Sequence, residues 1–416
     1  MQYNILERNL ARFLNKFPGL KLIVKKNYQK LNYIKYKKDY KVKTKYPLTK
    51  ISLEDKESFF GYYDKSPINE TNEYIIFHSS NIDTKNLPNS NVAVDIVLYD
   101  IKNNKYKIID KSFAYNWQQG SKLMWVDKYK FIYNVFEDNE YKSKIYDIKN
   151  NCFKIVDFPI YDTYKDKFAI SLNFERLDIG RGDYAYKNKN VKINWDDNSN
   201  DGLYFIDLEK NEKKLILTLQ DVIKFHYKDN MKNAKHKFNH IMISPNGEKI
   251  MFMHRWFLEN GRRLDTLLIC DKNGKNLKVI ADKEMISHCY WKDDENIFGY
   301  LRELAGDKFY IININTLEKK VIGKDIIDKY GDGHPTIYKE KVVFDTYPDK
   351  ARILHLFRYD IKVNDLEELG EFFQSFDFYE ETRCDLHPRF SFDGKKIFFD
   401  SVHEGKRHLY MMELDK

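Results

Sequence analysis

Four histidines recur at matching positions in the second half of the 416-residue sequence. His240, His288, His334 and His387 are separated by 48, 46 and 53 residues. Each is followed by a short apolar stretch, a polar turn and a second apolar stretch, such as residues 250–254 after His240. Because the histidine holds the same place in each unit, units arranged around an axis would bring the four imidazoles together.

Imidazoles gathered in this way could do two kinds of chemistry. Neutral imidazole nitrogens bind divalent metals such as Mn²⁺ or Zn²⁺, and Asp385, two residues before His387, could add an oxygen ligand. Imidazoles can also act as general acids or bases, because their pKa lies near neutrality. A structural alternative is that each histidine binds the backbone of the next unit. The spacing predicts a shared position and leaves these roles open.

Short β-strands must position these histidines. From about residue 60 to the end of the chain we recognise seven units of about 51 residues, each with three or four strand-like stretches. The aromatic content of 16% also favours strands over helices. This period is typical of propeller blades, so the sequence predicts an all-β fold, a seven-bladed β-propeller. The last unit lacks its outer strand, which residues 49–54 could supply to close the ring.

The propeller is expected to span residues 48–416, preceded by a basic amphipathic helical leader over residues 1–47. Residues 1–50 contain 14 Lys and Arg against two acids, a balance of +12, whereas the whole chain carries +8, so the remainder sums to −4. Apolar residues recur at helical spacing over residues 5–17, and after Pro18 and Gly19 a second basic stretch continues to about Tyr40. Residues 1–45 could lie on an anionic membrane surface or pack on the body. The acidic remainder argues against nucleic acid as a partner.

Propeller geometry also returns other side chains to the mouth where the histidines lie, because each second strand runs back toward the start of the first. The candidate catalytic residues are Arg255, His254, Arg383 and Tyr347. Aromatic, amide and charged side chains suit sugar rings, and the candidate substrate-binding residues are Tyr62, Tyr63, Lys65, Gln118, Gln119, Arg302, His403 and Arg407. The insertion at residues 174–200 is expected to act as a lid.

Several other classes of protein find no support. The sequence contains no Walker A motif, no GxGxxG and no GxSxG, so nucleotide hydrolysis and α/β-hydrolase chemistry are not indicated. No apolar run approaches the roughly 20 residues needed to span a bilayer, and no secretory signal is apparent. The four cysteines lie far apart and indicate free thiols. We therefore expect a cytoplasmic protein, with attachment to the inner face of the membrane as the alternative.

Several of these motifs carry a resemblance to known propeller families. The turns at residues 244–249 (SPNGEK) and 392–396 (FDGKK) resemble the WD40-like repeats of TolB-type propellers. A more specific resemblance is to oligogalacturonate-lyase-type propellers and their relatives in bacterial surface-polysaccharide gene clusters. It rests on residues 117–120 (WQQG), 239–240 (NH), 254–256 (HRW), 332–335 (DGHP) and 385–388 (DLHP).

The resemblance implies a metal-assisted lyase that acts on uronic-acid-containing glycans by β-elimination. In such an enzyme a divalent metal held by histidines binds the uronate carboxylate, and a basic side chain removes the neighbouring proton. Carried over, His334 and His387 are the first metal ligands, His288 and His240 the next, and Arg255 the base. The sequence departs from the family at Asp385, where a second histidine is usual. The alternative is a membrane-associated glycan-binding or glycosyltransferase-linked protein of surface-polysaccharide biosynthesis without lyase activity. Both take an acidic oligosaccharide or polysaccharide as partner.

Overall fold

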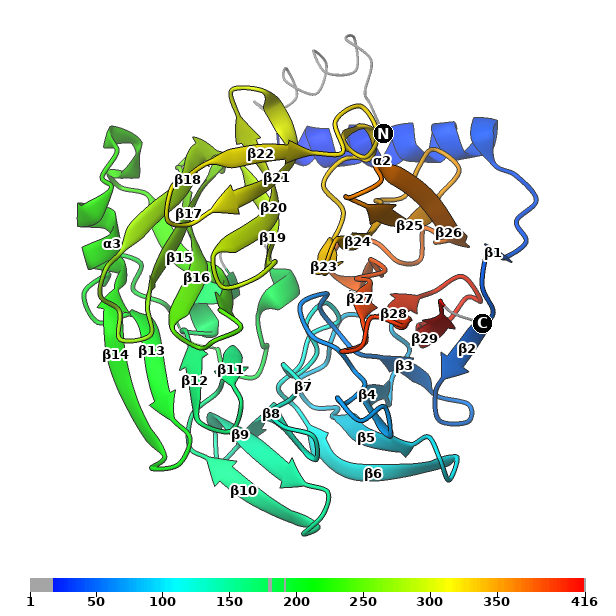
Figure 1. Cartoon of the computed structure of the whole chain (residues 1–416), viewed down its shortest axis with the longest axis horizontal. Coiled ribbons are helices and arrows are strands. Elements are labelled where there is room, and N and C mark those ends of the chain that lie inside the picture. The colour runs from blue at the N-terminus through cyan, green and yellow to red at the C-terminus, as the bar shows by residue number, and fades with distance from the viewer. Residues whose placement is uncertain (1–17, 179–181, 191, 415–416) are drawn as a thin grey trace.

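Seven antiparallel sheets form a ring around a central channel (Figure 1). The computed structural model describes residues 18–178, 182–190 and 192–414. The ring confirms the prediction of an all-β, seven-bladed β-propeller. The first four blades contain β3 (Glu57–Phe59), β4 (Tyr74–Ser80), β5 (Val94–Asp100) and β6 (Lys105–Ser112); β7 (Met124–Trp125), β8 (Lys130–Glu137), β9 (Glu140–Asp147) and β10 (Cys152–Val156); β11 (Asp162–Tyr164), β12 (Phe168–Ser171), β13 (Gly202–Asp207) and β14 (Glu212–Thr218); and β15 (Lys235–Ile243), β16 (Lys249–Phe257), β17 (Arg263–Asp271) and β18 (Lys278–Glu284).

The remaining blades follow the same order, and two of them receive a strand from the N-terminal region. They contain β19 (Ile286–Trp291), β20 (Asn296–Glu303), β21 (Gly306–Asn313) and β22 (Lys319–Ile322); β23 (Thr336–Tyr338), β24 (Lys341–Asp345), β25 (Ile353–Asp360), β26 (Asp365–Phe373) and the added β1 (Lys43–Thr44); and β27 (Arg389–Phe390), β28 (Lys396–Ser401), β29 (His408–Glu413) and the added β2 (Leu48–Ile51).

The ring closes where β2 pairs with β29. Leu48 lies opposite Met412 and Ile51 opposite Leu409, in an antiparallel register. This pairing confirms the predicted closure, with the strand at 48–51 instead of 49–54. Closure matters because the outer strand of the last blade would otherwise leave a free edge.

Burial along the strands follows their place in the blade. The second strand of the second blade, β8, is buried along most of its length, whereas the outermost strand, β10, is exposed until its last residue. Apolar clusters lie between neighbouring blades; one contains Met253 and Leu267 from the fourth blade and Trp291 and Ile297 from the fifth. Packing of blade against blade fixes the inner strands, which carry the histidines.

The second basic stretch of the leader forms helix α2 (Pro18–Tyr36), which lies along the propeller. The Tyr33 ring lies 6.1 Å from the Phe373 ring and 5.7 Å from the Phe376 ring, and the Tyr40 hydroxyl donates to the Glu371 carbonyl at 2.9 Å. One side of this stretch therefore packs on the sixth blade, as one of the two predicted alternatives required. The helix predicted over residues 5–17 lies outside the described residues.

Few other helical segments are present in the described ranges. They are α3 (Leu219–Phe225) and the 3₁₀ turns η1 (Glu175–Asp178), η2 (Gly182–Tyr184), η3 (Asp229–Met231), η4 (Asp328–Tyr330) and η5 (Glu380–Thr382). None of the helices in the described ranges combines the length and hydropathy needed to cross a bilayer.

Candidate functional site

The four repeat-related histidines meet at the axis of the ring. The ring centroids of His240 and His288 lie 5.9 Å apart, those of His288 and His334 4.2 Å, and those of His334 and His387 4.3 Å. The Tyr62 ring lies in their midst, stacked on His240 at 5.5 Å and 4.9 Å from His387. We call these four side chains the histidine cluster. Side chains from four different blades thus come together, as their repeat positions predicted.

Two members of the histidine cluster have an unusual backbone conformation. His240 and His387 have φ values of 50° and 46°, in the left-handed region that residues other than glycine rarely adopt. Gly333, just before His334, also has a positive φ of 46°, and a Cβ there would lie 2.0 Å from the Asp345 carbonyl oxygen. Such strained positions persist where the surrounding structure enforces them, and they concentrate at functional sites.

Asp345, at the end of β24, organises two of the histidines. Its carboxylate accepts hydrogen bonds from the backbone N–H of His334 at 2.6 Å and from the backbone N–H of His387 at 3.2 Å. It also lies 3.0 Å from Nδ1 of His334. Because Asp345 accepts the proton on Nδ1, the other ring nitrogen, Nε2, is left as an acceptor when His334 is neutral.

The tautomer of His387 is fixed in the same way. Its Nδ1 lies 3.0 Å from the Gly61 carbonyl oxygen, which can only accept a hydrogen bond, so Nδ1 carries the proton. Its Nε2 is buried and has no hydrogen-bond partner among the described residues. A buried imidazole nitrogen with an unused lone pair is uncommon and requires an explanation.

A divalent metal fits this arrangement. Ligand atoms of His334, Asp385 and His387 lie within 4.8 Å of one another, and all three residues are buried. Nε2 of His334 is 4.0 Å from a carboxylate oxygen of Asp385. Two imidazoles with fixed tautomers and one carboxylate form a donor set that Mn²⁺ and Zn²⁺ accept.

Local charge sets the protonation of the histidine cluster. Burial would lower the pKa of His334, but the neighbouring carboxylates of Asp345, Asp385 and Asp332 raise it above its ordinary value. Burial lowers the pKa of His387 and of His240, and nearby positive charges, including Arg389 and Arg255 respectively, lower each of them further. The cluster therefore combines a histidine that favours a positive charge with others that favour the neutral form.

Part of the predicted lid covers the histidine cluster. The Tyr184 ring lies 5.7 Å from the His240 ring, and its hydroxyl is 3.4 Å from that of Tyr62. Asp183 forms an ion pair with Arg383, on the far side of the mouth. Tyr347 lies 5.7 Å from His334 and, at 42% exposure, is the most open ring beside the cluster among the described residues. Tyr184 therefore covers the His240 side of the cluster, and the His334 side is the more open one.

Several other predicted residues lie near the histidine cluster. Arg383 contacts Asp385 at 2.7 Å, and its carbonyl accepts a hydrogen bond from Gln118 at 2.9 Å. Gln119 donates to the Tyr161 hydroxyl at 3.2 Å, and Tyr161 accepts the backbone N–H of His240. The residues that the structure brings to this mouth, besides the four histidines, are Asp385, Tyr62, Tyr63, Gln118, Gln119, Arg383 and Tyr347.

Arg255 lies on the neighbouring strand and is ion-paired. Its Nε is 2.8 Å from Asp265, which Arg263 also contacts at 3.2 Å. Its positive charge is one of those that lower the pKa of His240, so Arg255 acts electrostatically on the cluster. The structure thus places it near His240, with a carboxylate partner that sequence alone did not reveal.

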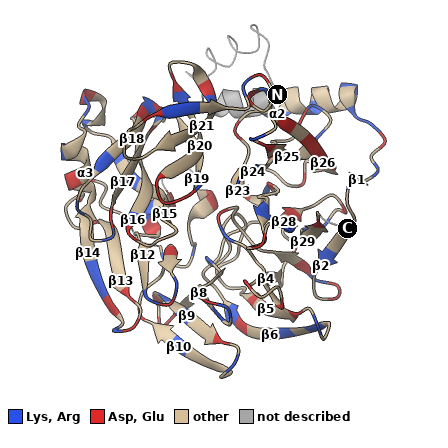
Figure 2. Ribbon diagram, viewed as in Figure 1, with Lys and Arg blue, Asp and Glu red and all other residues tan. Residues whose placement is uncertain are grey.

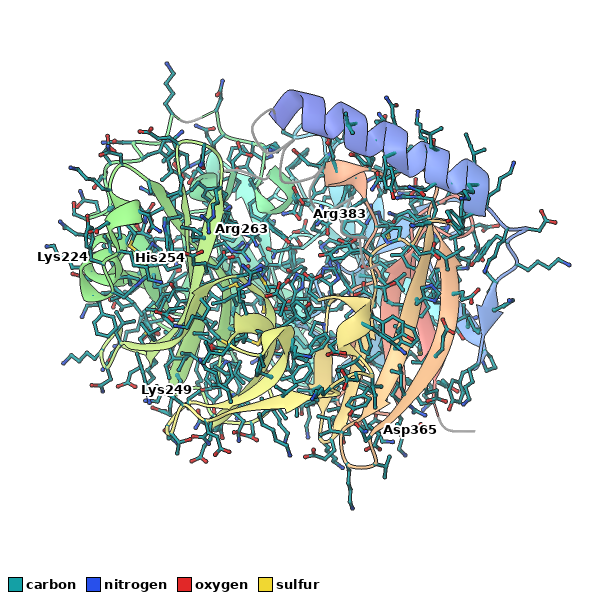
Figure 3. The ribbon with its side chains drawn as sticks, turned by 90° about the horizontal axis from the view of Figure 1, so that it is seen from above. Lys224, Lys249, His254, Arg263, Asp365 and Arg383 are labelled. Atoms are coloured by element: carbon teal, nitrogen blue, oxygen red, sulfur yellow. The ribbon has the colours of Figure 1, made fainter. Side chains whose placement is uncertain are left out.

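The prediction that His254 lies at the mouth is wrong. Successive side chains of a strand point to opposite faces, so His254 and Arg255 diverge on β16. His254 is buried in a separate chain of histidines, with Nδ1 3.0 Å from Nε2 of His226 and Nε2 2.9 Å from Nδ1 of His236. Figure 3 shows His254 away from the centre of the molecule.

Four predicted substrate-binding residues also have other roles. Lys65 bonds Asp162 at 2.6 Å and lines a cavity of about 320 Å³ together with Ser391 and Phe392. Arg302 pairs with Asp307 on an exposed hairpin. His403 packs against Phe372 and Tyr410 between the last two blades, and Arg407 is buried with its guanidinium on backbone carbonyls of residues 117, 382 and 383.

Sequence reasoning also missed residues that shape the site. Asp345 was not among the candidate site residues, and Tyr184 lay only within the predicted lid. Arg389 was not recognised at all; it donates to the carbonyls of Gly61 and His387 and thereby ties the first blade to the last. A carboxylate at the end of the strand that follows a repeated histidine was the one available signal.

Comparisons with known proteins establish the fold. No protein-family model matches the sequence, and no curated protein matches it. Oligogalacturonate lyase from Vibrio parahaemolyticus is similar over 90% of this chain and 97% of its own, with 13% identity and a TM-score of 0.62. A second structure, an oligogalacturonate lyase in complex with manganese, covers 92% of this chain and 96% of its own, with 15% identity and a TM-score of 0.63.

A third similar structure has a different function. The β-propeller domain of the trilobed protease from Pyrococcus furiosus covers 87% of this chain and 98% of its own, with 13% identity and a TM-score of 0.51. Its open velcro topology contrasts with the paired closure of this ring. The chain is therefore a seven-bladed β-propeller of the shape seen in oligogalacturonate lyases, with a candidate metal-binding group at one mouth.

Proposed function

We propose that the protein is a divalent-metal-dependent enzyme that cleaves uronic-acid-containing glycans by β-elimination. The observation that carries the proposal is the convergence of His334, Asp385 and His387, with the unused Nε2 of His387 directed at no other described partner. The likeness to an oligogalacturonate lyase in complex with manganese supports both the metal and the class of substrate. When bound, the metal would neutralise a uronate carboxylate and so acidify the adjacent C–H.

The chain itself would bind the sugar and move the protons. Tyr347 offers a partly exposed aromatic ring next to His334, suited to the face of a sugar. Tyr184, which lies over His240, would exclude water from that side of the cluster. The proton acceptor is either Arg255, as the resemblance implies, or His240, which burial keeps neutral. The ion pair of Arg255 with Asp265 favours a charged guanidinium, which suits a role in binding the carboxylate.

A glycan-binding protein without elimination chemistry is the second candidate. The observation that favours it is that two arginines near the cluster are engaged, Arg255 by Asp265 and Arg383 by Asp385 and Asp183. A guanidinium that is paired with a carboxylate keeps its proton, so it is poorly suited to remove a proton from the sugar. Binding without elimination would then be the role of these two arginines. The departure from a paired histidine at Asp385 points in the same direction.

Incubation with galacturonate and other uronic-acid oligomers plus Mn²⁺ tests the first proposal. We expect a product that absorbs in the ultraviolet as unsaturated uronides do, formed only with metal and abolished in His387→Gln. His240→Gln and Arg255→Lys would separate the two proton acceptors, because the one that removes the proton should lose turnover while the other mainly loses affinity. Binding of these oligomers without product would favour the second candidate, and absence of both binding and product would reject both.

A further inference from the structure

The outer face of helix α2 exposes apolar side chains among lysines. Leu31 and Ile34, one helical turn apart, are each 67% exposed. Lys30 and Lys35 are exposed beside them. We define these four residues as the outer face of α2. Residues 18–38 contain no acidic residue, so the charge of this face is uniformly positive (Figure 2).

The opposite side of the helix is fixed to the propeller. Tyr33 packs on Phe373 and Phe376, and Lys26 reaches from the helix to within 5.6 Å of the Tyr379 ring centre. Beyond the helix, β1 pairs Lys43 with Glu371 and so anchors the segment that follows. Because these contacts hold the helix in one rotation, Leu31 and Ile34 cannot turn inward to be buried.

The helix also lies on the same face of the ring as the mouth that contains the histidine cluster. Figure 3 shows α2 along the face near Arg383, whereas Lys249 and Asp365 lie at the opposite face. Tyr379, which Lys26 covers, and Arg383, which contacts Asp385, belong to the same loop between β26 and β27. A surface that docks on the outer face of α2 would therefore lie on the mouth side of the propeller.

We propose that the outer face of α2 docks on an anionic lipid bilayer. Lysines would contact the headgroups while Leu31 and Ile34 enter the boundary with the acyl chains, as in helices that lie in the membrane interface. A nucleic acid would satisfy the lysines but leave the two large apolar side chains in water. Two apolar side chains among lysines, with no acidic residue on the helix, therefore fit an anionic lipid surface better than a nucleic acid. The proposal is independent of the chemistry of the histidine cluster.

Vesicle co-sedimentation of the full-length protein tests this docking. Vesicles of phosphatidylcholine alone are compared with vesicles that also contain phosphatidylglycerol, and we expect binding only to the second. Leu31→Ser with Ile34→Ser should weaken the partition about tenfold or more, because most of the apolar area that enters the boundary is lost. Charge reversal by Lys30→Glu and Lys35→Glu should weaken it about a hundredfold.

Matched variants control for net charge and general exposure. Leu304→Ser changes a leucine that is 99% exposed on another blade, and Lys102→Glu and Lys320→Glu together make the same change in charge at exposed positions elsewhere. Both controls should bind as the unaltered protein does, since neither changes the outer face of α2. Equal retention on the two vesicle types, or helix variants that bind like their controls, would overturn the proposal. Binding of RNA or self-association through this face, without vesicle binding, would equally overturn it.

Discussion

Asp345→Asn tests whether the carboxylate at the end of β24 orients the histidines of the candidate metal site. The carboxylate of Asp345 is 1% exposed and serves three N–H groups, two from His334 and one from His387. An asparagine keeps the shape but turns one acceptor oxygen into a donor, which would face one of those N–H groups. His334 would then lose the partner that keeps Nδ1 protonated and Nε2 available.

The magnitude follows from these contacts. One buried charge-assisted hydrogen bond is lost, and the new amide N–H group faces another N–H donor. Together these changes should lower the free energy of unfolding by about 2–4 kcal/mol. Loss of a partner that orients a metal ligand typically weakens metal binding about 10–100-fold. We therefore expect the affinity for Mn²⁺, measured by isothermal titration calorimetry, to fall in that range while circular dichroism retains a β-sheet spectrum.

Asp95→Asn is the matched control for Asp345→Asn. Asp95 is equally buried, at 1% exposure, and bonds Lys56 at 2.7 Å on the first blade. Its replacement should also lower stability but leave Mn²⁺ affinity unchanged. If Asp345→Asn bound Mn²⁺ as tightly as the unaltered protein, or lost only as much affinity as Asp95→Asn, the assigned role of Asp345 would be wrong.

Two further predictions concern acid stability and access to the cluster. Burial lowers the pKa of His226 and of His236 from 6.5 to about 4, so between these values the unfolded chain takes up protons that the folded chain refuses, and stability should fall as the pH drops from 6.5 to 4. Allowing for partial exposure, each histidine contributes about 2 kcal/mol to this loss of stability. Urea unfolding at several pH values in this window should show that the free energy of unfolding falls less steeply as the pH drops in His226→Gln than in the unaltered protein. An identical dependence on pH would contradict the lowered pKa of His226. Tyr184→Ala should open the cover over His240 at a cost of about 3 kcal/mol, and diethylpyrocarbonate labelling of His240, followed by mass spectrometry, should accelerate several-fold. Unchanged labelling in this variant, with labelling of His408 as the internal reference, would show that Tyr184 is not the barrier.

The repeat in the sequence predicted the ring and the meeting of the histidines for one reason. Equivalent positions in a repeated unit become equivalent positions around an axis, so His240, His288, His334 and His387 needed no long-range information to be placed together. The closing strand was predictable for the same reason, since the last blade visibly lacked one.

Side-chain direction was not predictable in the same way. His254 and Arg255 are adjacent in sequence, but the pleat of β16 sends only one of them toward the cluster. Lys65 follows Tyr62 by three residues, yet it lines another cavity, together with Ser391 and Phe392. Such errors arise where a step of one to three residues turns the side chain to the other face of a strand or into a different cavity.

Partners supplied by distant segments were also beyond the sequence. The bond between Nδ1 of His387 and Gly61 joins residues more than three hundred positions apart, and it exists only because the ring closes. The Asp183 contact with Arg383 likewise depends on how the insertion folds over the mouth. These contacts determine the tautomers and the enclosure of the cluster, and thus its chemistry.

Metal stoichiometry tests the central claim most directly. Protein purified, stripped with a chelator and dialysed against Mn²⁺ should retain one equivalent of metal in elemental analysis, whereas the His334→Gln, His387→Gln double variant, folded by circular dichroism, should retain essentially none. The surface group of His355, Glu368 and Glu371 provides the internal check, because His355→Gln should leave the stoichiometry at one. Retention of the metal by the double variant, or failure of the unaltered protein to retain any, would contradict the account.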